Sequence, residues 1–150
     1  MNEGGETIVV GVDSSPSSHQ ALRWAAHMAK LTRASLQVIA CWESPTTEIW
    51  EIPPAFDSGD NARRTLEETV AEVLGGNPGI DINLTVIEGQ AAPVLLDAAR
   101  GASLLVVGSR NHRGLTGRHL GSVSERCVTH APCPVTVVRD VGDHDGGDPS

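Results

Sequence analysis

The chain has 150 residues, of which 39% are apolar, and a formal net charge of −8 at pH 7. This length suits one domain with a continuous core, and the apolar content argues against a disordered chain. The acidic balance disfavours nucleic-acid binding, and no apolar run approaches the roughly 20 residues that a membrane helix needs.

The N-terminus and the cysteines predict a cytoplasmic protein. Residues 1–6 are polar and acidic, unlike a secretory signal, and we expect them to be flexible. The three cysteines, Cys41, Cys127 and Cys133, form no Cys-x-x-Cys pair and no zinc-spaced cluster. Their odd number suits a reducing compartment, so we expect no disulfide and no resident metal.

The first half of the chain alternates predicted strands and helices. Residues 7–13 are apolar, β-branched and end at a carboxylate, as in a buried strand. Turn and N-cap residues at 14–18 then open a helix of about four turns. Residues 35–42 predict a second strand, and three prolines within 43–58 predict a long loop. A second amphipathic helix follows and ends at the Gly-Gly-Asn-Pro of residues 75–78.

The second half continues the alternation. An alternating strand is predicted at 80–88, a short helix at 91–99 and a fully apolar strand at 103–108. A glycine-rich loop and a fourth helix precede a fifth strand at 134–139. Residues 140–150 hold four Asp and three Gly, which predicts a disordered acidic tail.

This order predicts an α/β fold with an open parallel sheet and helices on both faces. Ligands of such sheets bind outside the carboxyl ends of the strands, where the strand order reverses. Asp13 and Gly108 both end apolar strands, although the residues alone leave open whether these two strands are neighbours.

The segment from Gly108 to Ser124 has the composition of an anion-binding loop. Its glycines permit close backbone approach, and Ser122 and Ser124 open a helix whose N–H groups favour an anion. Residues 98–124 contain no Asp or Glu, whereas an even spread of the 19 acids would give about three. The alternative is a plain connection with a capping serine, but the missing acids favour anion binding.

Three separated motifs resemble the universal stress protein family. Gly108, Asn111 and Gly121-Ser122 stand at the spacing of its signature, G-x2-G-x9-G-[S/T]. Residues 9–15 look like its first strand with the terminal aspartate, and residues 130–138 look like its last helix-to-strand corner. The resemblance covers roughly residues 6–139.

The resemblance implies a Rossmann-like domain at 7–139, similar to adenine nucleotide alpha hydrolases, with strand order 3-2-1-4-5. It also implies a stress-response regulator or sensor that binds ATP or AMP at the carboxyl ends of strands 1 and 4. Asp13 matches the aspartate that accepts hydrogen bonds from ribose, although it could also be only a turn residue. The other matching positions surround adenine, ribose and phosphate: Gly11, Val12, Cys41, Val107, Gly108, Asn111, Gly121, Ser122, Val123 and Ser124.

Two arginines and one asparagine complete the predicted site. Arg110 and Arg113 lie in the loop, where phosphate contact competes with simple solvation. Asn111 replaces the second signature glycine. Asparagine tolerates a positive φ, but its side chain would obstruct a nucleotide that presses on the Cα. We favour retained binding; the alternative is a nucleotide-free dimeric scaffold that signals by protein contact.

The residues favour binding over catalysis. Near the loop the only carboxylates are Asp13, which the resemblance assigns to ribose, and Glu125; there is no Walker-type lysine. We expect at most slow ATP hydrolysis, with any Mg²⁺ carried by the phosphates. A dehydrogenase is disfavoured because residues 13–18 contain no glycine, and a response-regulator receiver because the first strand lacks an acidic pair. The apolar strand at 135–138 would be a sheet edge, which favours a homodimer through it, as is typical of the family.

Overall fold

The computed structural model describes residues 5–13, 15–43, 59–76, 79–109 and 121–139. The predicted flexible N-terminus, long loop, most of the glycine-rich segment and acidic tail therefore lie largely or wholly outside the described residues. Strands and helices alternate along the chain as predicted. They are β1 (Thr7–Gly11), α1 (Pro16–Thr32), β2 (Ser35–Trp42), α2 (Gly59–Leu74), β3 (Ile82–Glu88), α3 (Ala91–Ala98), β4 (Leu104–Gly108), α4 (Ser122–His130) and β5 (Val135–Val138).

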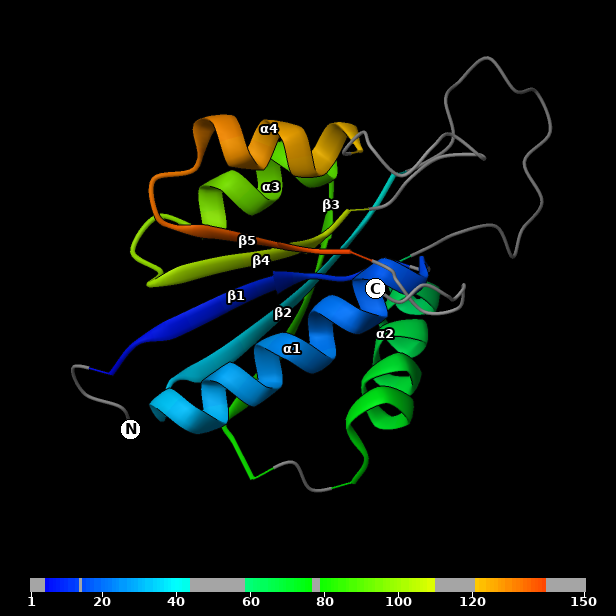
Figure 1. Ribbon diagram of the computed structural model, residues 1–150. Helices are drawn as coiled ribbons and strands as arrows, with labels where there is room; N and C mark the ends of the chain where they lie inside the picture. Colours follow the sequence, from blue (N-terminus) through cyan, green and yellow to red (C-terminus); the bar gives the residue numbers. More distant parts are fainter. Residues whose placement is uncertain (1–4, 14, 44–58, 77–78, 110–120, 140–150) are drawn as a thin grey trace, which may run out of the picture.

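The five strands form one parallel sheet of order β3-β2-β1-β4-β5, which confirms the predicted topology. The strand order reverses between β1 and β4, whose registers pair Val10 with Val106. Figure 1 shows α1 and α2 on one face of the sheet and α3 and α4 on the other. All five carboxyl ends therefore lie along one edge, with a reversal point at its centre.

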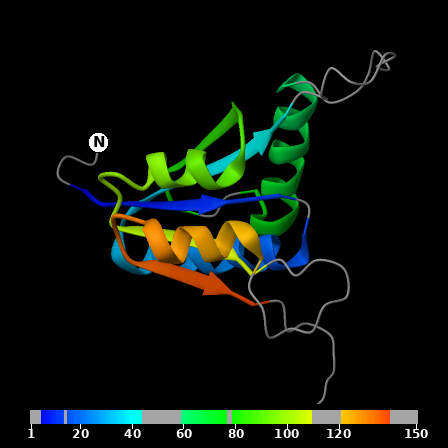
Figure 2. The same cartoon turned by 90° about the horizontal axis from the view of Figure 1, so that it is seen from above.

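Side chains alternate between two apolar layers because successive residues of a strand point to opposite faces. In β1, Val10 packs with the α1/α2 layer, whereas Val9 packs with the α3/α4 layer. The same alternation separates Val38 from Ile39 in β2. Figure 2 shows α3 and α4 side by side over their face. The two layers bury both faces of the central strands.

Helix α1 has clear start and stop signals. The side chain of Ser15 caps it by accepting from the Ser18 amide, and Pro16 occupies the first turn. Arg33 ends it in the left-handed region with φ 60°. Its inner stripe is fully buried and mostly alanine, which lets the helix lie close to the sheet: Ala21, Leu22, Ala25 and Ala29.

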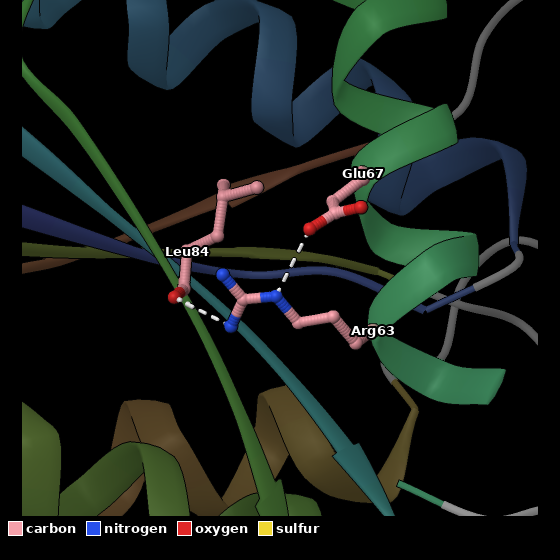
Figure 3. A network of polar contacts seen from close by, with 3 residues as sticks. All are labelled: Arg63, Glu67 and Leu84. Atoms are coloured by element: carbon pink, nitrogen blue, oxygen red, sulfur yellow. Dashed lines mark hydrogen bonds and ion pairs between the residues drawn. The ribbon is translucent and has the colours of Figure 1, made fainter. Parts of the chain in front are cut away.

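Helix α2 is attached to the edge strand β3 by one arginine (Figure 3). Arg63 donates from Nε to Glu67 at 3.1 Å and from Nη1 to the carbonyl of Leu84 at 3.4 Å. Leu66 is the residue of α2 that is buried in the α1/α2 layer. The predicted single apolar face of β3 is confirmed, since Ile82, Leu84 and Val86 all pack against the α1/α2 layer.

Candidate functional site

A cavity of about 660 Å³ opens at the carboxyl edge of the sheet. Its size falls in the range of small-molecule sites, and its place at the strand reversal is where α/β sheets bind ligands. Seven of the predicted site residues line it: Gly11, Val12, Asp13, Cys41, Val107, Gly108 and Val123. The adjacency of the first and fourth strands, which the residues alone left open, thus brings Asp13 and Gly108 to one cavity.

Two glycines allow helices to approach the strand ends. A Cβ at Gly11 would lie 2.7 Å from Cδ1 of Leu95, a residue of α3 that also lines the cavity. A Cβ at Gly108 would lie 2.6 Å from the carbonyl carbon of Ser17 in α1. Glycine is therefore needed at both positions because a helix lies in close contact with the strand end. Neither glycine has a positive φ.

Asp13 organises the turn between β1 and α1. Its Oδ1 accepts from the backbone amide of Ser15 at 2.7 Å and from the Ser15 hydroxyl at 2.6 Å. Its own amide donates to the hydroxyl of Ser18, which in turn donates to the Asp13 carbonyl at 2.8 Å. These contacts fix an exposed carboxylate at the cavity. The turn interpretation and the ligand interpretation of Asp13 are therefore compatible.

The end of β2 supplies a thiol and an indole. Burial, and to a smaller degree the charge of Glu43, raises the pKa of the Cys41 thiol to about 11, so this thiol stays neutral at physiological pH. Trp42 points to the opposite face, where its ring lies 3.3 Å from the position of a Cβ on Gly59 at the start of α2. Both side chains line the cavity.

The start of α4 lies next to the end of β4. The amide of Gly121 donates to the carbonyl of Ser109 at 2.9 Å, which joins the two ends of the predicted glycine-rich loop. Gly121 is the N-cap, and the first amides of α4 have no intrahelical acceptor by geometry. Val123 lines the cavity, whereas Gly121, Ser122 and Ser124 are not among its lining residues.

Ser124 is turned inward. It is 1% exposed, and its hydroxyl donates to the carbonyl of Gly121 at 3.1 Å. This side chain therefore closes the first turn of α4, and any contact with an anion in this conformation would use its backbone amide. Arg110, Asn111 and Arg113 lie outside the described residues, so their predicted roles stay predictions.

The structure adds lining residues that the sequence did not single out. One face of α2 contributes Asn61, Thr65 and Thr69, and α1 contributes His19. Asn61, Thr65 and Thr69 are spaced by four residues, which places them on one face of α2. Only the fold shows that this face borders the strand ends.

Charge and metal ligands are limited in the described part of the site. The cavity has the carboxylates of Asp13 and Glu43 on its wall, and no described lysine or arginine lines it. Across the described ranges, no group of three or more His, Cys, Asp or Glu is arranged to hold a metal ion.

These features define a class: a doubly wound α/β domain with a ligand cavity at the reversal point of a parallel sheet. The family model of the Universal stress protein family matches residues 5–139. The chain belongs to the universal stress protein family, as its three motifs indicated.

Individual relatives agree with the family assignment. The chain is 34% identical over 154 aligned residues to Universal stress protein Rv2623 of Mycobacterium tuberculosis, covering 93% of this chain and 50% of that protein. It thus spans about half the length of the curated relatives it matches. Among the helices that the structure describes, none has the length and apolarity to cross a bilayer.

Solved structures share the fold. UspA from Lactobacillus plantarum superposes with a TM-score of 0.71 at 22% identity, over 89% of this chain and 97% of that chain. A universal stress protein in complex with cAMP superposes with a TM-score of 0.64 at 25% identity, over 91% of this chain and 98% of that chain.

Proposed function

We propose that this protein binds an adenine nucleotide, ATP or AMP, and acts as a stress-response regulator or sensor. The observation that supports the proposal is the cavity between the ends of β1 and β4, with Asp13 and Gly108 on its wall. Family relatives include one solved with cAMP, which is the same chemical class of ligand. The apolar wall suits a base, and the carboxylate of Asp13 suits ribose hydroxyls.

The phosphates would lie toward the start of α4. The amides of its first turn and the positive end of its dipole favour an anion. The same turn carries one acidic residue, Glu125. The described wall of the cavity carries two carboxylates and no lysine or arginine. The negative charge of the phosphates would therefore be stabilised by the helix amides and by Arg110 and Arg113, in the role predicted for them. We expect binding with at most slow hydrolysis, because Asp13 is assigned to the ribose and the chain has no Walker-type lysine.

Isothermal titration with AMP and ATP, each with and without Mg²⁺, tests the proposal. We expect saturable binding of at least one nucleotide, and about tenfold weaker binding in Asp13→Asn, because one of two carboxylate acceptors is lost. This variant keeps an oxygen for Ser15, so the turn at the start of α1 is retained. Asp97→Asn, which changes an exposed carboxylate that does not line the cavity, is the matched control.

Absence of binding by wild-type protein, with no nucleotide released on denaturing the purified protein, would overturn the proposal. The chain would then be the nucleotide-free dimeric scaffold. Equal losses in Asp13→Asn and Asp97→Asn would remove the role given to Asp13.

We also propose a homodimer formed through the outer edge of β5. The Leu105 amide donates to the carbonyl of Pro134, and the Ser109 amide donates to that of Val138, so these residues of the last strand face β4. The backbone groups of Val135 and Val137 consequently point away from the sheet. Such an edge is suited to pairing with a second copy. A cytoplasmic location stays a prediction. The three cysteines on which that prediction rests are free in the structure.

A further inference from the structure

The residues that line the cavity come from both faces of the sheet, and we divide the cavity into two lobes on that basis. The predicted nucleotide residues Gly11, Cys41, Val107 and Val123 point to the α3/α4 face, where Leu95 also lies. The other lobe lies on the α1/α2 face. We define this α2 lobe by its lining residues: Val12, His19, Ala40, Trp42, Asn61, Ala62, Thr65, Leu66 and Thr69.

The α2 lobe combines an apolar floor with polar groups. Ala40, Leu66 and the indole of Trp42 supply the floor. Asp13 and Glu43, which follow the lobe residues Val12 and Trp42 in the chain, also line the cavity. Leu66 and Val70 pack α2 into the apolar layer of the sheet, and Arg63 contacts the carbonyl of Leu84 in β3 (Figure 3). These contacts set the face of the helix that carries Thr65 and Thr69. The lobe is therefore a built surface on two packed elements.

The two threonines differ from the other helical threonines with described hydroxyl bonds. Thr32 and Thr129 each donate to the carbonyl four residues earlier, at 2.8 and 2.9 Å. No such bond to a described residue is present for Thr65 or Thr69, and both line the cavity. Each hydroxyl can therefore donate to and accept from a ligand without breaking a contact of the folded chain.

We propose that the α2 lobe is a second subsite, which takes the other nucleoside half of a dinucleotide whose adenosine half occupies the α3/α4 lobe. This inference rests on the proposed nucleotide binding. A planar ring can lie on Trp42, and ribose hydroxyls or an amide can reach Thr65, Thr69 and His19. Asp13 and Glu43 on the wall disfavour further phosphates and tolerate a ring of positive charge, such as nicotinamide.

The test is a titration of wild-type protein with AMP, ADP and NAD⁺, repeated with the double variant Thr65→Val, Thr69→Val. ADP has the same pyrophosphate as NAD⁺ but lacks the second nucleoside. We expect NAD⁺ to bind about tenfold more tightly than ADP, and the double variant to lose about that factor for NAD⁺ while ADP changes less than twofold.

Thr32→Val is the matched control, since it removes an exposed helical threonine hydroxyl that does not line the cavity. Circular dichroism melting checks that the variants fold. Binding of AMP and ADP with no preference for NAD⁺, or an equal loss for all three ligands, overturns the second subsite and leaves nucleotide binding intact. No binding of any of the three overturns both proposals.

Discussion

Gly108, the last residue of β4, lies directly against Ser17 in the first turn of α1. A Cβ at Gly108 would lie 2.6 Å from the carbonyl carbon and 2.7 Å from the carbonyl oxygen of Ser17, which is itself 2% exposed. Both neighbours are backbone atoms and have little freedom to move. The signature glycine therefore sets how closely the start of α1 approaches the reversal point of the sheet.

Gly108→Ala is expected to destabilise the fold by about 1–3 kcal/mol, because the added methyl must displace the backbone of α1. The measurement is the urea unfolding midpoint at constant m-value. Gly76→Ala serves as control, since a Cβ there would meet nothing within 4 Å and the residue has no positive φ. A loss for Gly108→Ala no larger than that of the control would contradict the close contact.

Gly11→Ala is expected to weaken nucleotide binding more than it weakens the fold. Its Cβ would lie 2.7 Å from Cδ1 of Leu95, and this side-chain end can turn, but Leu95 lines the cavity. The displaced methyl would then narrow the α3/α4 lobe. We expect a rise in Kd of about tenfold by titration with the proposed nucleotide, corresponding to about 1.4 kcal/mol.

The second variant Gly11→Ala, Leu95→Val separates steric from other causes. Removing one methylene makes room for the added methyl, so the double variant should recover part of the lost affinity. Affinity that falls further in the double variant would show that Leu95 does not mediate the effect.

The fold was predictable because each element carries its own signal. Apolar β-branched runs marked the strands, and the serine and proline before residue 17 marked the start of α1. The adjacency of β1 and β4 came from the family resemblance, since strand order depends on packing across the whole sheet. Strand ends were less predictable: the first strand was expected to reach Asp13 but ends at Gly11, because the Asp13 amide turns to Ser18.

The predicted site residues that line the cavity come from strand ends and from α4, and most of them face the α3/α4 layer. Gly11, Cys41 and Val107 were predicted from the family resemblance, and all three stand at or next to strand ends. Thr65 and Thr69 carried no motif, and their place on the cavity wall appears only when α2 is packed beside β2. The direction of a side chain was also beyond the sequence, as the inward hydroxyl of Ser124 illustrates.

The Cys41 thiol is expected to resist alkylation at neutral pH. Burial, with the charge of Glu43, raises its pKa from an ordinary 9.0 to about 11. The folded state thus keeps a proton that the unfolded chain releases first as pH rises. The stability contributed by this shift is fully present below pH 9 and is lost between about pH 9 and 11.

The measurement is the rate of iodoacetamide labelling of the Cys41 peptide between pH 7 and 11, followed by mass spectrometry. Glu43→Gln should move the midpoint to lower pH, because a negative charge near the thiolate is removed. Glu72→Gln, on the exposed surface of α2, should leave it unchanged. A midpoint near 9 in wild-type protein would contradict the protected thiol.

The two outer edges of the sheet differ in their backbone contacts. The amide of Leu36 donates to the carbonyl of Asp81, so alternate residues beginning at Ile82 direct their backbone groups away from β2. One of these outward carbonyls, that of Leu84, accepts from Arg63 at 3.4 Å. In β5, no side chain of the described residues donates to the outward carbonyls of Val135 and Val137. Within the described residues, this difference between the two edges supports the proposed association through β5.

Val137→Pro is therefore expected to convert the proposed dimer to monomer. The outward amide of Val137 is removed, while the bonds from β4 to the carbonyls of Pro134 and Val138 remain. Size-exclusion chromatography with light scattering measures the mass, and Val137→Thr, which keeps the amide and a β-branched side chain, is the control. Because Val137 also packs against the α3/α4 layer, a melting curve must show that the proline variant is folded. A folded proline variant that remains dimeric would place the interface away from β5, since an edge cannot pair normally where its outward donor is missing.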